Sequence, residues 1–132
     1  MAKLATRRLL LDSGAIIGLS RNDPRPRAVL ASAWEAGIDV YIPSVALAAT
    51  VRGNATDAPV NRIIKAIGEI VPVHEQDGRL AGSLLGTTRS KSTIDAIIVA
   101  IAIRLGSVAI LTGDPKDLTT LAAGQQVRIE SF

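Results

Sequence analysis

The sequence contains no cysteine, and this absence excludes several kinds of functional site at once. Disulfides, thiolate zinc sites, iron–sulfur clusters and cysteine nucleophiles all need a residue that the chain lacks. His74 is the single histidine, so a Ser-His-Asp triad or a two-histidine metal site would have to use it or do without. Carboxylates, hydroxyls and basic side chains remain, and they favour a metal site built from oxygen ligands if the protein is an enzyme.

Aromatic residues and long apolar runs are also scarce. Trp34, Tyr41 and Phe132 are the only aromatic residues, too few for an RNA platform that stacks bases. The longest apolar run, 96–103, is far shorter than the roughly 20 residues of a membrane span. Because the N-terminal stretch shows no signal-peptide pattern, we expect a cytoplasmic protein with no membrane partner.

What the sequence does contain is a large aliphatic fraction. Hydrophobic residues make up 48% of the 132 positions, which predicts a single folded domain spanning 1–132 with an aliphatic core. Lysine and arginine exceed the acids by 15 to 12, giving a formal net charge of +3. A mildly basic chain of this kind is compatible with a nucleic-acid partner without requiring one.

Short apolar stretches alternate with stretches of helical periodicity along the whole chain. The pattern predicts strands over 8–12, 38–42, 70–73, 107–111 and 127–130, and helices over 13–19, 27–36, 43–52, 57–67, 75–85, 93–105 and 115–122. Continuously apolar strands that alternate with helices are typical of a parallel sheet with both faces covered. We therefore expect an α/β fold with a parallel sheet of four to five short strands flanked by helices.

Acidic residues follow two of the expected strands and begin one of the helices. Asp12 ends the first strand, Asp114 follows the fourth, and Asp95 lies in the first turn of the most apolar helix. Asp117 comes three residues after Asp114, so the two can share one face of a helix start. Ligands of open parallel sheets bind outside the carboxyl ends of the strands, where these acids should meet.

Each acid also has a purely structural interpretation. Asp114 before Pro115 could cap a helix, Ser92 with Asp95 resembles a capping box, and Asp12 could simply lead into a turn. Taken together, however, several acids at one edge of a sheet repel one another, and such a cluster usually needs a cation. Mg²⁺ or Mn²⁺ suits an all-oxygen site, so Asp12, Asp95 and Asp114 form a candidate phosphodiesterase site.

Four stretches carry a resemblance to a known family. The chain resembles PIN-domain proteins, and more narrowly the VapC-type toxins of bacterial toxin–antitoxin pairs, in 9–17 (LLLDSGAII), 42–53 (IPSVALAATVRG), 94–106 (IDAIIVAIAIRLG) and 109–118 (AILTGDPKDL). The resemblance implies a magnesium-dependent endoribonuclease, cleaving tRNA or rRNA, that a cognate antitoxin neutralises. It also implies a homodimer.

The same resemblance assigns roles to individual positions. Asp12, Asp95 and Asp114 match the acids that hold metal in the family, and Asp117 matches an acid that often supplements the site. Thr112 matches a hydroxyl position that orders an acid or a metal-bound water.

One position departs from the family pattern. The helix after the second strand usually carries a glutamate, and the matching residue here is Ala49. No acid occurs between Asp39 and Asp57, so a neighbour cannot easily substitute. Two explanations compete: the natural protein is impaired or noncatalytic, or the alanine is a deliberate detoxifying substitution.

Two cations lie in the polar loop just before Asp95. Arg89 and Lys91 are therefore the basic residues that we expect to contact RNA phosphates. Trp34 falls on the apolar face of its helix, which favours a place in the core or in an interface. The competing function is a noncatalytic module that binds an antitoxin, with RNA as a further candidate ligand. A receiver-type phosphoacceptor domain would need a second acid beside Asp12, where Ser13 and Gly14 stand.

Overall fold

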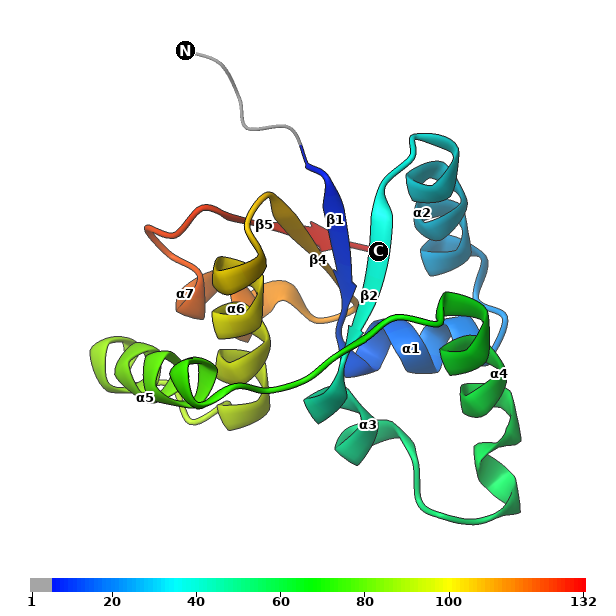
Figure 1. Cartoon of the computed structure of the whole chain (residues 1–132), viewed down its shortest axis with the longest axis horizontal. Coiled ribbons are helices and arrows are strands. Elements are labelled where there is room, and N and C mark those ends of the chain that lie inside the picture. The colour runs from blue at the N-terminus through cyan, green and yellow to red at the C-terminus, as the bar shows by residue number, and fades with distance from the viewer. Residues whose placement is uncertain (1–5) are drawn as a thin grey trace.

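A five-stranded parallel sheet forms the centre of the protein, seen in a computed structural model that describes residues 6–132 (Figure 1). The strand order is β3-β2-β1-β4-β5, and every neighbouring pair is parallel. The strands are β1 (Arg8–Leu11), β2 (Asp39–Pro43), β3 (Ile70–Val71), β4 (Val108–Thr112) and β5 (Val127–Ser131). The predicted α/β class and the parallel sheet are confirmed.

Strands β1 and β4 carry apolar residues on both faces, because helices cover both faces of the sheet. Leu10 of β1 belongs to a cluster with α6, whereas Leu9 and Leu11 pack on the opposite side with α1. All five residues of β4 are buried. Such strands alternate between two cores instead of between core and solvent, which is why their sequences show no polar alternation.

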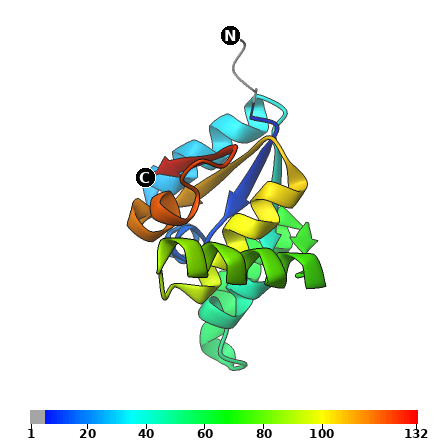
Figure 2. The ribbon, with the colours of Figure 1, turned by 90° about the vertical axis from the view of Figure 1, so that its left-hand side faces the viewer.

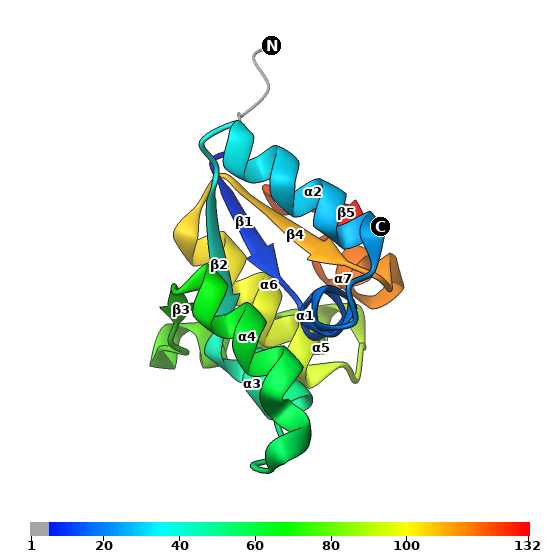
Figure 3. The same cartoon turned by 90° about the vertical axis from the view of Figure 1, so that its right-hand side faces the viewer.

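Helices cover the two faces as separate groups. One face carries α1 (Ser13–Ser20), α2 (Pro24–Glu35) and α4 (Ala58–Ile67), as Figure 3 shows. The other face carries α5 (Glu75–Thr88), α6 (Thr93–Leu105) and α7 (Pro115–Leu121), as Figure 2 shows. The short α3 (Ser44–Thr50) follows β2 directly, and a 3-10 turn, η1 (Ala55–Asp57), leads into α4. Within residues 6–132 no helix is long and apolar enough to cross a membrane.

Several boundaries differ from the sequence-based expectation, among them those of α2, α5 and β3. Helix α2 begins at Pro24 instead of residue 27, because Asp23 caps it by accepting a hydrogen bond from the Arg25 amide, and proline suits a first helical turn. Helix α5 continues through Gly86 to Thr88. Strand β3 has only two residues, since the chain leaves the sheet edge at Pro72.

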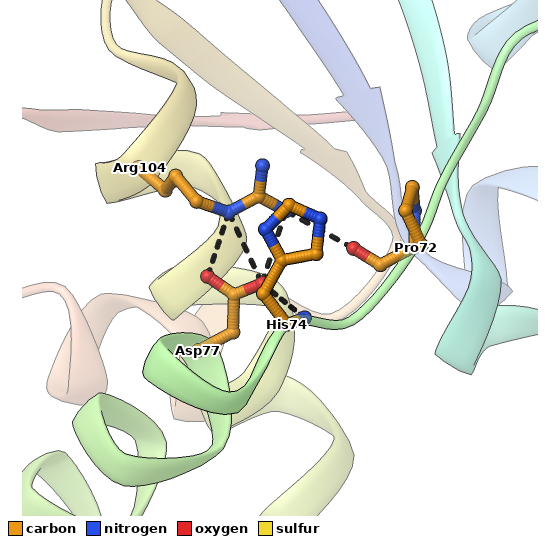
Figure 4. A network of polar contacts seen from close by, with 4 residues as sticks. All are labelled: Pro72, His74, Asp77 and Arg104. Carbon is orange, nitrogen blue, oxygen red and sulfur yellow. Dashed lines mark hydrogen bonds and ion pairs between the residues drawn. The ribbon is translucent and has the colours of Figure 1, made fainter.

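A buried ion pair fastens α5 to α6 (Figure 4). The Arg104 guanidinium donates to both oxygens of Asp77, with Nε–Oδ1 at 2.9 Å and an Nη2–Oδ2 bond at 3.0 Å. It also donates to the Pro72 carbonyl at 3.0 Å, and the His74 amide donates to Asp77 at 2.8 Å. Burial acts to raise the pKa of Asp77, but these hydrogen bonds outweigh it and the pKa is lowered.

Candidate functional site

Asp12 stands where β1 ends and α1 begins. It is buried, and its Oδ1 caps α1 by accepting a hydrogen bond from the Ala15 amide at 2.7 Å. Burial raises the pKa of Asp12, bonds from Thr112 and Ala15 oppose the rise, and the charge of Asp114 adds to it. Asp12 is thus the cap of α1 and does not simply lead into a turn, and its carboxylate also faces the charge of a second acid.

Thr112 joins the ends of two adjacent strands. Leu11 pairs with Leu111, so Asp12 and Thr112 emerge side by side at the carboxyl edge of the sheet. Thr112 is fully buried, and its hydroxyl interacts with Asp12 while accepting the Asp114 amide at 3.0 Å. One hydroxyl therefore holds the turn that carries Asp114 and lowers the pKa of the Asp12 carboxyl.

Asp95 approaches the same edge from a helix on the other face. It lies in the first turn of α6, and the pKa of its carboxyl is raised to about 6. The main cause is burial, followed by the negative charges of Asp12, Asp117 and Asp114. The fold thus brings all four predicted acids into one electrostatic cluster, which we call the acidic cluster (Asp12, Asp95, Asp114 and Asp117).

Two of the capping interpretations are wrong. Asp114 precedes α7 but makes no side-chain capping bond, and Ser92 precedes α6 without capping it. Instead the Ser92 hydroxyl donates to Oδ2 of Asp117 at 2.8 Å, across 25 residues of sequence. Helix capping therefore does not account for Asp114 or Asp95.

The donor chemistry of the acidic cluster fits a hard divalent cation, because all its donors are carboxylate oxygens that repel one another. In the described part of the chain, however, no three acids or histidines are gathered closely enough to hold a metal ion as they stand. The acids are therefore close enough to repel one another but not close enough to coordinate one ion. Charges interact over many ångströms, whereas Mg²⁺–oxygen bonds are about 2 Å long.

Ala49, the position of the missing family glutamate, is half-buried on α3. This helix contacts both α1 and α6, the helices whose starts carry Asp12 and Asp95. A side chain at position 49 therefore comes from an element next to the acidic cluster.

The two predicted RNA-binding cations precede the helix that carries Asp95. Arg89 and Lys91 are both exposed in the loop between α5 and α6. A cavity of about 330 Å³ opens at this point, and its lining consists of Ser13, Lys91, Ser92, Thr93, Ile94 and Asp95. Trp34, by contrast, is 51% exposed on α2 and is not a core residue.

Residues 9–122 match the sequence profile of the PIN domain. The chain belongs to the PIN-domain family. No curated protein sequence matches it, but solved structures do. The VapBC2 complex of Rickettsia felis bound to a promoter DNA fragment aligns over 95% of this chain and 98% of the matched chain, with 14% identity and a TM-score of 0.76. DNA-bound VapBC of Salmonella typhimurium aligns over 94% and 97%, with 16% identity and a TM-score of 0.70.

A third similar structure is a toxin–antitoxin complex from Klebsiella pneumoniae, at 21% identity and a TM-score of 0.68 over 90% of this chain and 94% of the other. At such identities the likeness establishes the PIN fold. The predicted family is confirmed. The residues that match the PIN profile, 9–122, include all four members of the acidic cluster.

The sequence interpretation missed Ser92 as a member of this site. Its hydrogen-bond partner Asp117 was expected to supplement the metal site. Because the two residues lie 25 positions apart, no local sequence pattern connects them. The one available signal is the alternation of hydroxyl residues at 88, 90 and 92, which ends at the start of the helix that carries Asp95.

Proposed function

We propose that this PIN-domain protein is the toxin of a toxin–antitoxin pair and a metal-dependent endoribonuclease whose catalysis is weakened by Ala49. The acidic cluster carries the proposal, because burial and then the charges of three neighbouring carboxylates raise the pKa of Asp95 to about 6, in a family whose members are generally nucleases. A fold that holds like charges together at this cost in stability is expected to use them.

The proposed ligands are Asp12, Asp95 and Asp114, and the proposed cation is Mg²⁺, with Mn²⁺ as a substitute. When bound, the cation would supply charge stabilisation at a phosphodiester and lower the pKa of water. In this proposal Thr112 orients Asp12 and the turn to Asp114, Asp117 supplements the charge of the cluster, and Arg89 and Lys91 hold RNA phosphates. The proposed substrate is RNA, with tRNA or rRNA as the expected targets.

A cognate antitoxin is the proposed protein partner, and a cytoplasmic homodimer is the proposed state. The similar structures support the antitoxin, since they are VapBC or toxin–antitoxin complexes that share this fold. The loss of the family glutamate favours a second candidate, a noncatalytic PIN module that binds an antitoxin, with RNA as a further candidate ligand. It predicts tight antitoxin binding with no RNA turnover under any metal.

Restoring the glutamate separates the two candidates. We expect Ala49→Glu to raise Mg²⁺-dependent RNA cleavage by at least about tenfold, because mutations around metal ligands change activity or affinity by roughly 10–100-fold. The measurement is cleavage of labelled tRNA and rRNA fragments with Mg²⁺, Mn²⁺ or EDTA.

The matched control is Ala48→Glu, which adds the same charge to an exposed neighbour on α3. Adding Asp12→Asn to the restored variant should abolish the gain. If folded Ala49→Glu protein cleaves no RNA with either metal, the catalytic proposal is wrong and the binding module replaces it.

A further inference from the structure

The loop between α5 and α6 is held by alternate hydroxyl side chains. The Thr88 hydroxyl donates to the Leu84 carbonyl at 2.7 Å and accepts the Ser90 amide at 3.3 Å. The Ser90 hydroxyl in turn accepts the Ser92 amide at 3.1 Å. We call Thr88, Ser90 and Ser92 the hydroxyl ladder. It connects the last turn of α5 to the residue just before α6.

The ladder ends on the acidic cluster. A serine at the start of a helix usually accepts an amide of the first turn, which stabilises the helix by about 1 kcal/mol. Ser92 makes no such bond and donates instead to Asp117 in the first turn of α7. This hydrogen bond adds to the packing of α6 on α7 and joins the start of α6, which carries Asp95, to the helix that follows Asp114.

The residues between the members of the hydroxyl ladder are exposed cations. Arg89 has a left-handed backbone conformation, with φ of 60°, at the end of α5, and it is exposed, as is Lys91. The two exposed cations therefore alternate along the chain with the three hydrogen-bonded hydroxyl residues. The ladder therefore fixes where these cations stand relative to Asp95.

We propose that Ser92 is a positioning residue of the acidic cluster. Its hydroxyl fastens the start of α6 to Asp117, and so sets the position of Asp95 and of the basic loop. Asp117 then acts through Ser92 and through its charge, with one of its oxygens already committed. The inference rests on the proposed function, because it assigns Ser92 to a site whose metal and RNA chemistry is itself proposed.

Hydrogen exchange on the metal-free protein tests the positioning directly. We expect Ser92→Ala to speed exchange of the hydrogen-bonded amides of Ser92, Thr93 and Ala96 by about fivefold, because a hydrogen bond to α7 worth about 1 kcal/mol is lost. Ser92→Thr retains a hydroxyl and should restore slow exchange. Ser83→Ala, which removes an exposed serine hydroxyl from α5, is the matched control and should leave these amides unchanged.

Mn²⁺ binding followed by electron paramagnetic resonance tests the consequence for the site. Ser92→Ala should weaken Mn²⁺ binding by about tenfold, as expected when a residue that orients ligands is lost, and Ser92→Thr should bind like the unmodified chain. Asp117→Asn keeps an oxygen that accepts from Ser92, so its loss should be smaller than that of Asp12→Asn. Asp39→Asn, at the opposite edge of the sheet, controls for charge alone.

The outcomes separate the two proposals. Unchanged exchange and unchanged Mn²⁺ binding in Ser92→Ala would overturn the positioning role while leaving the metal site intact. Asp117→Asn as damaging as Asp12→Asn, with Ser92→Ala harmless, would show that Asp117 binds metal directly. If neither the unmodified chain nor Ala49→Glu binds Mn²⁺, the proposed metal function fails, and the exchange measurement alone decides whether Ser92 holds the loop.

Discussion

At the scale of single residues, the acidic cluster works against folding. Asp95 is half-buried among three other acids, and its pKa of about 6 lies well above its ordinary value of 3.8. A carboxyl whose pKa is raised in the folded state binds protons more tightly there than in the unfolded chain. The ionised form therefore costs stability at neutral pH, as is common for residues that serve function.

Removing this charge should stabilise the metal-free protein. We expect Asp95→Asn to raise the free energy of unfolding by roughly 1–3 kcal/mol at pH 7, since one pKa unit corresponds to about 1.4 kcal/mol. The gain should shrink as pH falls from about 6 towards 4, because the native carboxyl then becomes neutral as well. Urea unfolding in EDTA at several pH values measures it, with Asp39→Asn as the exposed control. Equal stability at pH 7 would contradict the repulsion.

At the scale of elements, α5 and α6 form a hairpin whose two ends are fastened differently. The hydroxyl ladder holds the connecting loop, and the Asp77–Arg104 pair holds the opposite end (Figure 4). The side chain of Asp77 is 1% exposed and that of Arg104 is 19% exposed. A pair this deeply buried is costly to break, because the partner left behind remains charged in the interior.

The buried pair should matter far more than the exposed pair on the same helix. We expect Asp77→Asn to lower the free energy of unfolding by about 3 kcal/mol, near the lower end for a broken buried pair because Arg104 keeps some solvent contact. Glu75→Gln, which breaks the fully exposed Glu75–Arg79 pair, should change it by less than about 0.5 kcal/mol. Urea denaturation measures both, and equal losses would contradict the difference in burial.

The same pair sets part of the acid sensitivity. The folded pKa of Asp77 is lowered below its ordinary value of 3.8, so its contribution is complete above that value and is lost as pH falls below it. Asp77→Asn should therefore flatten the acid limb of the stability curve.

At the scale of the whole molecule, the parallel sheet decides where function can lie. Two strand ends and two helix starts meet at its carboxyl edge, and they come from positions 12, 95, 112 and 114. A cation bound there would join segments from both halves of the sequence. Its binding energy would then appear as stability of the entire fold.

Divalent metal should raise the unfolding temperature in a pH-dependent way. At a metal concentration 100 times Kd the expected stabilisation is about 2.7 kcal/mol. We expect a larger effect at pH 7.5 than at pH 5.5, because below about pH 6 protons compete for Asp95. Thermal unfolding with Mg²⁺, Mn²⁺ and EDTA measures the effect, and Asp12→Asn is the control. Equal stabilisation of both proteins would show that the ions act elsewhere.

Local sequence determined the elements because their signals are local. The apolar runs around Leu10 and Ile110 predict strands buried on both faces, and the helix at 93–105 has the bounds that its pattern predicts. The boundaries that differ are set by small contributions from capping bonds and tertiary packing. At Asp23, for example, a capping hydrogen bond allows α2 to begin at Pro24.

The sequence by itself also determined which residue types could do chemistry, because it holds no thiol and a single imidazole. Only the tertiary structure decided how the acids relate to one another. The chain order places Asp12 and Asp95 far apart, and the parallel register of β1 with β4 and the packing of α6 unite them. The Ser92–Asp117 and Asp77–Arg104 contacts were invisible for the same reason: each joins residues 25 or more positions apart, and such pairs are chosen by packing, not by local propensity.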